Sequence, residues 1–154
     1  MMQKVDILKL SSQDTELLKA CSVLDRLCLP SEAWSFESFR AETEKPSGIV
    51  LAAVNQDSVL TGFLTASCII DTADLTNIAV SPACRRQGIA GMLLQALFSE
   101  CGQADIFLEV RESNQNAIAL YQKYQFRQVG IRKNFYHNPE ENAILMQYGG
   151  NSLC

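Results

Sequence analysis

The sequence predicts a single α/β domain, built on a mixed and mostly antiparallel sheet of about seven strands with helices on both faces. Strands joined by short turns come first, and strands alternate with helical segments afterwards, which together favour this class. The chain has 154 residues, of which 47% are hydrophobic, as suits one domain with its own core. We expect the domain to cover residues 1–150 and a short tail to follow at 151–154.

A strand and then a helix open the chain. Residues 5–10 alternate partly between apolar and polar side chains, which favours a strand. Ser11 or Ser12 can cap the helix that follows, in which apolar residues recur at steps of three and four as far as Cys28. Pro30 ends this helix, because proline lacks the backbone N–H that an interior helical position needs.

A short helix and three strands come next. Ser35 can cap a helix that runs to about Glu44. Apolar and β-branched runs then predict strands at 49–54, 59–70 and 73–80, with a turn at 55–57. We expect a bulge at Gly62, because glycine inside a strand often marks one.

In the second half, helices alternate with strands. An apolar repeat that begins at Ile89 predicts an amphipathic helix ending near Gly102. Residues 105–110 are almost wholly apolar, as in a strand buried in the middle of a sheet. Ser113 or Asn114 can cap the next helix. The last two strands are expected at 127–136 and 143–148, joined by a turn at 137–141.

Charge, cysteine content and hydropathy exclude several classes of function. The net charge is −4, with 6 Lys and Arg against 11 Asp and Glu in residues 1–80 and 7 against 6 in the remainder. We therefore expect no direct nucleic-acid binding, which needs a broad cationic face, and we favour a cationic substrate. The cysteines form no Cys-x-x-Cys pair, which argues against a metal site. The sequence has no signal-peptide pattern and no apolar run of about 18 residues, so we expect a cytoplasmic protein that does not bind membranes.

The segment 77–91 joins a strand to a helix through a basic turn that contains glycine. It reads Asn-Ile-Ala-Val-Ser-Pro-Ala-Cys-Arg-Arg-Gln-Gly-Ile-Ala-Gly, and Pro82 ends the strand. Small residues let backbone N–H groups converge on an anion at a helix N-terminus, where the helix dipole also favours negative charge. The turn is neither a Walker A loop nor a Rossmann fingerprint, and an unliganded turn with exposed arginines is the alternative interpretation.

Three further residues are candidates for function. Glu109 interrupts an apolar strand, which indicates a gap in the sheet or a functional role, and a salt bridge to Arg111 or a lysine is the alternative. Tyr121 lies on the same helix face as Asn114, although a tyrosine there can simply be a core aromatic. Trp34 is either a hydrophobic plug between helix and sheet or an aromatic wall for a substrate.

Five motifs, taken together, resemble those of the GNAT acetyltransferases. They are Asn-Ile-Ala-Val-Ser-Pro at 77–82, Arg-Arg-Gln-Gly-Ile-Ala at 85–90, Leu-Glu-Val-Arg-Glu-Ser-Asn at 108–114, Ala-Ile-Ala-Leu-Tyr at 117–121 and Gln-Phe-Arg-Gln-Val-Gly at 125–130. The resemblance is greatest to the branch of ribosomal-protein-alanine N-acetyltransferases, known as RimI, and spans about Val5 to Tyr148. Three departures stand out: Ala90 replaces the commoner second glycine, Ala33 replaces the proline usual before the loop tryptophan, and the stretch around Gly102 is short.

The resemblance implies the GNAT (acyl-CoA N-acyltransferase) fold, acetyl-CoA as cosubstrate and no metal. Carried over residue by residue, it makes Glu109 the proton acceptor and Tyr121 the proton donor, and we expect Trp34 and Tyr136 to bind the acceptor substrate. The implied contacts with acetyl-CoA are Ile78, Ala79, Val80, Arg86, Gln87, Gly88, Ile89, Ala90, Gly91 and Asn114.

The implied reaction moves an acetyl group from acetyl-CoA to the N-terminal α-amine of a protein, with the N-terminal alanine of a small-subunit ribosomal protein as acceptor. An α-amine, with a pKa of about 8, loses its proton more readily than a lysine at about 10.4. The acidic first half favours a basic peptide, although such charges more often serve only solvation. Two alternatives stay open: a GNAT enzyme for a lysine, a small amine or an antibiotic, and a noncatalytic acyl-CoA-binding module.

Overall fold

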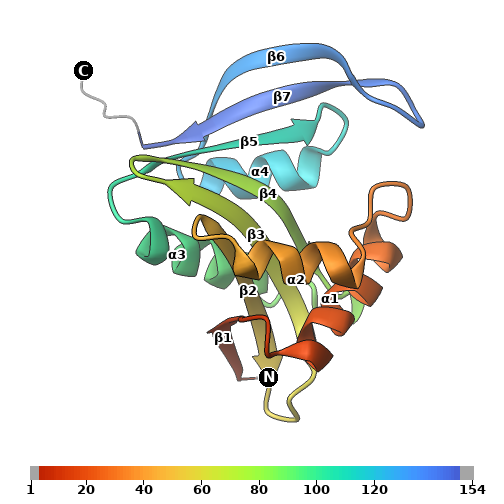
Figure 1. Cartoon of the computed structure of the whole chain (residues 1–154). Helices are drawn as coiled ribbons and strands as arrows, with labels where there is room; N and C mark the ends of the chain where they lie inside the picture. Colours follow the sequence, from red (N-terminus) through yellow and green to blue (C-terminus); the bar gives the residue numbers. More distant parts are fainter. Residues whose placement is uncertain (1–3, 150–154) are drawn as a thin grey trace.

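One seven-stranded sheet forms the centre of the molecule in the computed structural model, which describes residues 4–149 (Figure 1). Its strand order is β1-β2-β3-β4-β5-β7-β6. β4 and β5 are parallel, and the other five neighbouring pairs are antiparallel. The strands are β1 (Val5–Lys9), β2 (Gly48–Asn55), β3 (Leu60–Ile69), β4 (Thr72–Val80), β5 (Asp105–Arg111), β6 (Arg127–Tyr136) and β7 (Glu141–Tyr148). The predicted mixed, mostly antiparallel sheet is confirmed, and the expected tail at 151–154 lies outside the described residues.

Helices cover both faces of the sheet, as predicted. They are α1 (Thr15–Cys28), α2 (Phe36–Glu44), α3 (Ile89–Cys101) and α4 (Gln115–Lys123), with a short 3-10 helix, η1 (Pro82–Cys84), between β4 and α3. α1 and α2 lie on one face of the sheet, and α3 and α4 lie on the other (Figure 1). No helix within residues 4–149 is long and apolar enough to cross a membrane.

Two hydrophobic cores result from this layering. On the α1/α2 face, Leu18 and Phe39 pack with Phe63. On the α3/α4 face, Leu93 packs with Ile106 and other buried side chains of the sheet. Side chains of a strand alternate between faces, so the central strands contribute to both cores and have almost continuous apolar sequences.

Side-chain caps explain where α2 and α4 begin. The Ser35 side chain accepts a hydrogen bond from the backbone N–H of Ser38 at 3.1 Å, and Asn114 caps α4 in the same way. The expected cap at Ser11 or Ser12 is wrong, because α1 begins at Thr15. The backbone N–H of Ser11 instead donates to Asp14 Oδ2 at 2.7 Å, which forms a turn ahead of the helix.

Two bulges change which face the residues of β3 and β4 point to. In β3 the extra residue is Thr61, next to Gly62, where a bulge was predicted. In β4, Leu75 pairs with Ala66 and Asn77 pairs with Thr65, which leaves Thr76 as an extra residue. This bulge turns Asn77 toward α1, where its side chain donates to Asp25 Oδ1 at 2.8 Å.

β4 and β5 separate soon after they begin. They pair only over Thr72–Asp74 and Asp105–Phe107, so the carboxyl-terminal parts of the two strands share no ladder. We call this opening the splay. It leaves the edge of β4 beyond Asp74 without a strand partner on the β5 side, and therefore leaves backbone groups in the middle of the sheet free to bind a ligand.

Candidate active site

A cleft of about 700 Å³ opens at the splay between β4 and β5. Residues of β4, of the turn before α3, of β5 and of α4 line it, together with two segments from the α1/α2 face. Most of the residues predicted for the site meet here: Ile78, Ala79, Val80, Arg86, Gly88, Ile89, Ala90, Gly91, Glu109, Asn114, Tyr121 and Tyr136. Gln87 and Trp34 are not among the lining residues.

The cleft passes through the sheet and joins its two faces. Leu108 and Val110 of β5 are buried in the core on the α3/α4 face. Because neighbouring residues of a strand point to opposite faces, Glu109 points toward the α1/α2 face. Tyr121 belongs to α4 and reaches the cleft from the other side. The two predicted proton-transfer residues therefore approach one cavity from opposite faces of the sheet.

The N-terminus of α3 forms one end of the cleft. Gly88 occupies the N-cap position with φ +80°, and no side chain caps the helix. The first-turn N–H groups of an α-helix lack partners within the helix, so this end is suited to an anion. Arg86 makes no hydrogen bond or ion pair within residues 4–149, whereas Arg85 donates to the Val80 carbonyl at 3.2 Å. One arginine thus holds the turn and the other is available to a ligand.

Gly91 and Gln87 have particular roles in this turn. A Cβ atom at Gly91 would lie 1.9 Å from the hydroxyl of Tyr124, so any other residue here would have to displace that ring. Tyr124 lies one helical turn after Tyr121 and also lines the cleft, although the sequence analysis assigned it no role. In the part of the chain that the structure describes, Gln87 Oε1 is the only side-chain oxygen or nitrogen that is itself fully shielded from solvent and has no hydrogen-bond partner.

Tyr121 is held in a protonated state. The residue is 6% exposed, and its hydroxyl makes no hydrogen bond within residues 4–149. Burial raises the pKa of Tyr121 above its ordinary value, and the nearby Tyr136 raises it further. Its ring contacts Phe126 edge-on at a centroid distance of 5.7 Å. A neutral phenol that faces a cavity can donate a proton but does not act as a base near neutral pH.

Glu109 lies at the gap in the sheet that the sequence analysis suggested. Its side chain is 32% exposed, and its carboxylate pairs with Arg132 Nε at 2.9 Å. The predicted salt bridge of Glu109 to Arg111 or to a lysine is therefore wrong in its partner. The strand order explains why, since β7 places Leu145 opposite Glu109 and Ala143 opposite Arg132, so the arginine reaches diagonally across β7.

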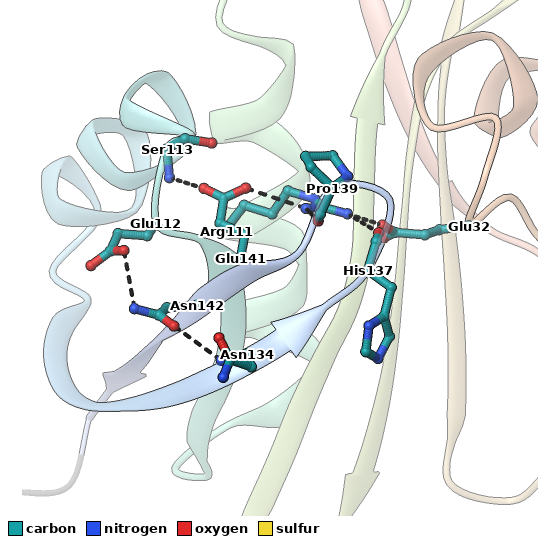
Figure 2. A network of polar contacts seen from close by, with 9 residues as sticks. All are labelled: Glu32, Arg111, Glu112, Ser113, Asn134, His137, Pro139, Glu141 and Asn142. Atoms are coloured by element: carbon teal, nitrogen blue, oxygen red, sulfur yellow. Dashed lines mark hydrogen bonds and ion pairs between the residues drawn. The ribbon is translucent and has the colours of Figure 1, made fainter.

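A cluster around Arg111 closes the cleft on the α1/α2 face (Figure 2). Its guanidinium lies 4.5 Å from the centroid of the Tyr136 ring and pairs with Glu32 and Glu141. Burial, with the Glu109 carboxylate as the next cause, raises the pKa of Tyr136 to about 12. No local pattern reveals this cluster, because Glu32 and Arg111 are 79 residues apart in the chain.

Trp34 takes the first of its two expected positions, the hydrophobic plug. Its ring contacts Phe39 at a centroid distance of 5.3 Å in the core on the α1/α2 face. Its backbone N–H donates to Asp25 Oδ2 at 2.8 Å, and its carbonyl accepts from Ser22 Oγ at 2.9 Å. Trp34 therefore supports the loop that carries Glu32 from behind, outside the lining of the cleft.

Comparison with known proteins shows the family to which the chain belongs. The sequence matches the Acetyltransferase (GNAT) family over residues 16–126. The [ribosomal protein bS18]-alanine N-acetyltransferase of Haemophilus ducreyi is 40% identical over 102 residues, which cover 62% of this chain and 70% of the relative. The enzyme of the same name from Salmonella typhimurium is 34% identical over 146 residues, which cover 84% of this chain and 96% of the relative.

A solved structure shares the whole architecture. The crystal structure of the ribosomal-protein-S18-alanine N-acetyltransferase from Escherichia coli superposes with a TM-score of 0.81 at 30% identity. The superposition covers 98% of this chain and 100% of that chain. By sequence and by fold, the chain belongs to the GNAT acetyltransferase family.

Proposed function

We propose that this protein transfers the acetyl group of acetyl-CoA to the N-terminal α-amine of a protein, and that the acceptor is the N-terminal alanine of the small-subunit ribosomal protein bS18. The observation that carries the proposal is the approach of Glu109 and Tyr121 to one cleft from opposite faces of the sheet. The acceptor follows from the relatives that carry this name, one of which aligns with 84% of the chain.

The α3 end of the cleft fits a phosphate-bearing cosubstrate. Arg86 is free of protein partners within residues 4–149, and the N-terminus of α3 carries no side-chain cap. Asn114 uses its side-chain oxygen to cap α4 at 3.2 Å, which leaves its amide N–H groups for a ligand. Residues 78–80, on the unpaired edge of β4, offer backbone groups along the cleft. When bound, acetyl-CoA would supply the activated acetyl thioester.

Transfer to an amine requires a neutral amine, a polarised carbonyl and a proton for the leaving thiol. We assign Glu109 to remove the proton of the amine, directly or through a water, with Arg132 holding the carboxylate in place. Backbone N–H groups of residues 78–80 would stabilise the charge that develops on the thioester oxygen. The hydroxyl of Tyr121 would give its proton to the sulfur as the carbon–sulfur bond breaks and recover one from solvent.

The acceptor would reach Glu109 from the α1/α2 face. Three carboxylates, of Glu32, Glu109 and Glu141, and two guanidinium groups, of Arg111 and Arg132, are paired there. This cluster has a net charge of −1, which favours a cationic N-terminus over an anionic ligand. An α-amine with a pKa of about 8 is also the easier amine to deprotonate.

The decisive experiment offers acetyl-CoA with matched acceptors. They are a peptide that begins with alanine, the same peptide acetylated at its N-terminus and carrying an internal lysine, and a panel of small amines and aminoglycosides. Release of the coenzyme A thiol gives the rate, and mass spectrometry gives the position of the acetyl group. We expect kcat/KM for the alanine peptide to exceed that of each other acceptor by at least about tenfold.

Each alternative has its own outcome in this experiment. A faster reaction with lysine or with a small amine would replace the proposed acceptor. Binding of acetyl-CoA without thiol release from any acceptor would indicate a noncatalytic module, in which Glu109 and Tyr121 would have no use.

A further inference from the structure

The side chain of Arg111 connects the two loops that border the acceptor side of the cleft. One is the α1–α2 loop, residues 29–35, and the other is the β6–β7 loop, residues 137–140. We infer that Arg111 is a positioning residue that clamps these loops together and thereby fixes the shape of the acceptor-binding side. This inference rests on the proposed function and assigns a role to a residue that does not itself touch the reacting atoms.

The contacts of Arg111 reach three segments of the chain (Figure 2). Nη2 donates to Glu32 Oε2 of the α1–α2 loop at 2.7 Å and to the His137 carbonyl at 3.1 Å. Nη1 donates to the Pro139 carbonyl at 2.9 Å and to Glu141 Oε1 of β7 at 3.2 Å. One side chain on β5 thus holds the α1–α2 loop, the β6–β7 loop and the start of β7.

These contacts use all the N–H donors of the two terminal guanidinium nitrogens of Arg111. Each terminal nitrogen of arginine carries two N–H groups, and each of the two nitrogens of Arg111 has two protein acceptors. No terminal N–H is left for an incoming peptide. The arginine is therefore suited to holding protein segments together, in contrast to Arg86, whose side chain has no partner within residues 4–149.

The side chains of Arg111 and Glu141 are partly shielded from solvent, whereas that of Glu32 is exposed. The side chain of Arg111 is 18% exposed and that of Glu32 is 38% exposed. Charge-assisted hydrogen bonds in such partly desolvated sites are shorter and stronger than those between neutral groups. Glu141 is fixed in turn by the backbone N–H of Ser113, next to the Asn114 cap of α4.

The clamp forms part of the cleft wall beside the proposed base. Arg111 lies two residues after Glu109 on the same strand and therefore on the same face. Its guanidinium stacks on the ring of Tyr136, which lines the cleft together with Glu32 and Leu29. Loss of the clamp would let the two loops separate at the place where the acceptor binds, whereas the N-terminus of α3 lies on the other face of the sheet.

The test is a set of variants of the full chain, assayed with acetyl-CoA and the alanine peptide. For Arg111→Gln we expect the peptide KM to rise about tenfold, with kcat and the KM for acetyl-CoA changed less than about threefold. For Glu32→Ala, which removes only the arm to the α1–α2 loop, we expect a smaller rise of about fivefold. Lys9→Met is the matched control, because it breaks an exposed ion pair with Glu100 away from the cleft and should leave all constants unchanged.

A double-mutant cycle separates a clamp from direct binding by Glu32. If Glu32 acts through Arg111, Glu32→Ala should add little to the peptide KM of Arg111→Gln. Full additivity of the two effects would overturn the clamp, as would an equal rise in the KM for acetyl-CoA. If Arg111→Gln does not fold, Arg111→Lys takes its place in the cycle, since it keeps the charge but loses the fork that reaches both loops.

Hydrogen exchange tests the clamp without an acceptor. In Arg111→Gln, amides of residues 29–35 should exchange about tenfold faster than in the wild type, and in Lys9→Met they should be unchanged. Unchanged protection would refute the clamp even if the enzyme acetylates the peptide. Loss of protection together with an inactive wild type would instead leave the clamp in place and refute the proposed function.

Discussion

Removal of the Tyr121 hydroxyl should separate activity from stability. In Tyr121→Phe the ring keeps its edge-on contact with Phe126, because only one oxygen is lost. That oxygen makes no hydrogen bond within residues 4–149, so no protein group loses a partner in the variant. We expect the free energy of unfolding to change by less than about 1 kcal/mol.

The effect on catalysis should be much larger. A positioned general acid contributes about 10²- to 10⁴-fold to a rate, which corresponds to about 3 to 5 kcal/mol of activation free energy. The measurement is kcat from thiol release at saturating acetyl-CoA and alanine peptide, with calorimetry for the affinity of acetyl-CoA. We expect kcat to fall by that factor while the affinity for acetyl-CoA stays within about threefold of the wild type.

Tyr148→Phe is the matched control. Tyr148 stacks on Phe98 at a centroid distance of 4.1 Å and does not line the cleft, so its variant should keep wild-type kcat. A kcat of Tyr121→Phe within about threefold of the wild type would refute the acid role. A melting temperature lower by more than about 5 °C would show that the hydroxyl serves stability instead.

Three further changes test other parts of the site and core. Glu109→Gln should lower kcat by about 10²-fold or more while leaving stability nearly unchanged, since Arg132 stays solvated; wild-type activity across the pH range would exclude Glu109 as base. In Gly91→Ala the new Cβ would lie 1.9 Å from Tyr124 Oη, so we expect a higher KM for acetyl-CoA and a free energy of unfolding in urea that is lower by about 1–3 kcal/mol. Adding Tyr124→Leu should restore that stability, and no restoration would contradict a clash with Tyr124. Burial, with Asp25 as the lesser cause, raises the pKa of Cys21 from 9.0 to about 12. The protonated thiol of Cys21 therefore contributes its full stabilisation below pH 9 and loses it toward pH 12. Between these pH values the free energy of unfolding of the wild type should fall by about 1.4 kcal/mol per pH unit more than that of Cys21→Ala, and an equal fall in both would contradict the raised pKa.

Local sequence signals predicted most of the secondary structure, and the resemblance to the GNAT acetyltransferases named most of the residues that line the cleft. Periodicity identified the strands and helices, because the spacing of apolar residues reflects which side of each element faces a core. The exception is the start of α1, where Asp14 forms a turn that the serines alone do not reveal. The turn before α3 could be singled out because glycine and small residues at a helix start are what an anion site requires of the sequence.

The partners of the charged residues needed the tertiary structure. Glu109 pairs with Arg132 because β7 is inserted between β5 and β6, a strand order that no local pattern encodes. The clamp at Arg111 joins segments that are 79 residues apart, and Trp34 supports a loop from behind the cleft. Sequence periodicity indicates which side of a helix or strand faces a core. An ion pair between distant residues depends instead on which elements the fold brings together.

The sequence by itself determined the elements, and it predicted an anion-binding turn and, through the resemblance to the GNAT acetyltransferases, the residues proposed to transfer protons. Only the tertiary structure decided that β4 and β5 part after three paired residues. That opening lets Glu109 and Tyr121 reach the same cavity from opposite faces of the sheet. The physical reason is that side-chain chemistry is local, whereas a gap in a sheet results from strand pairing, twist and packing over the whole molecule.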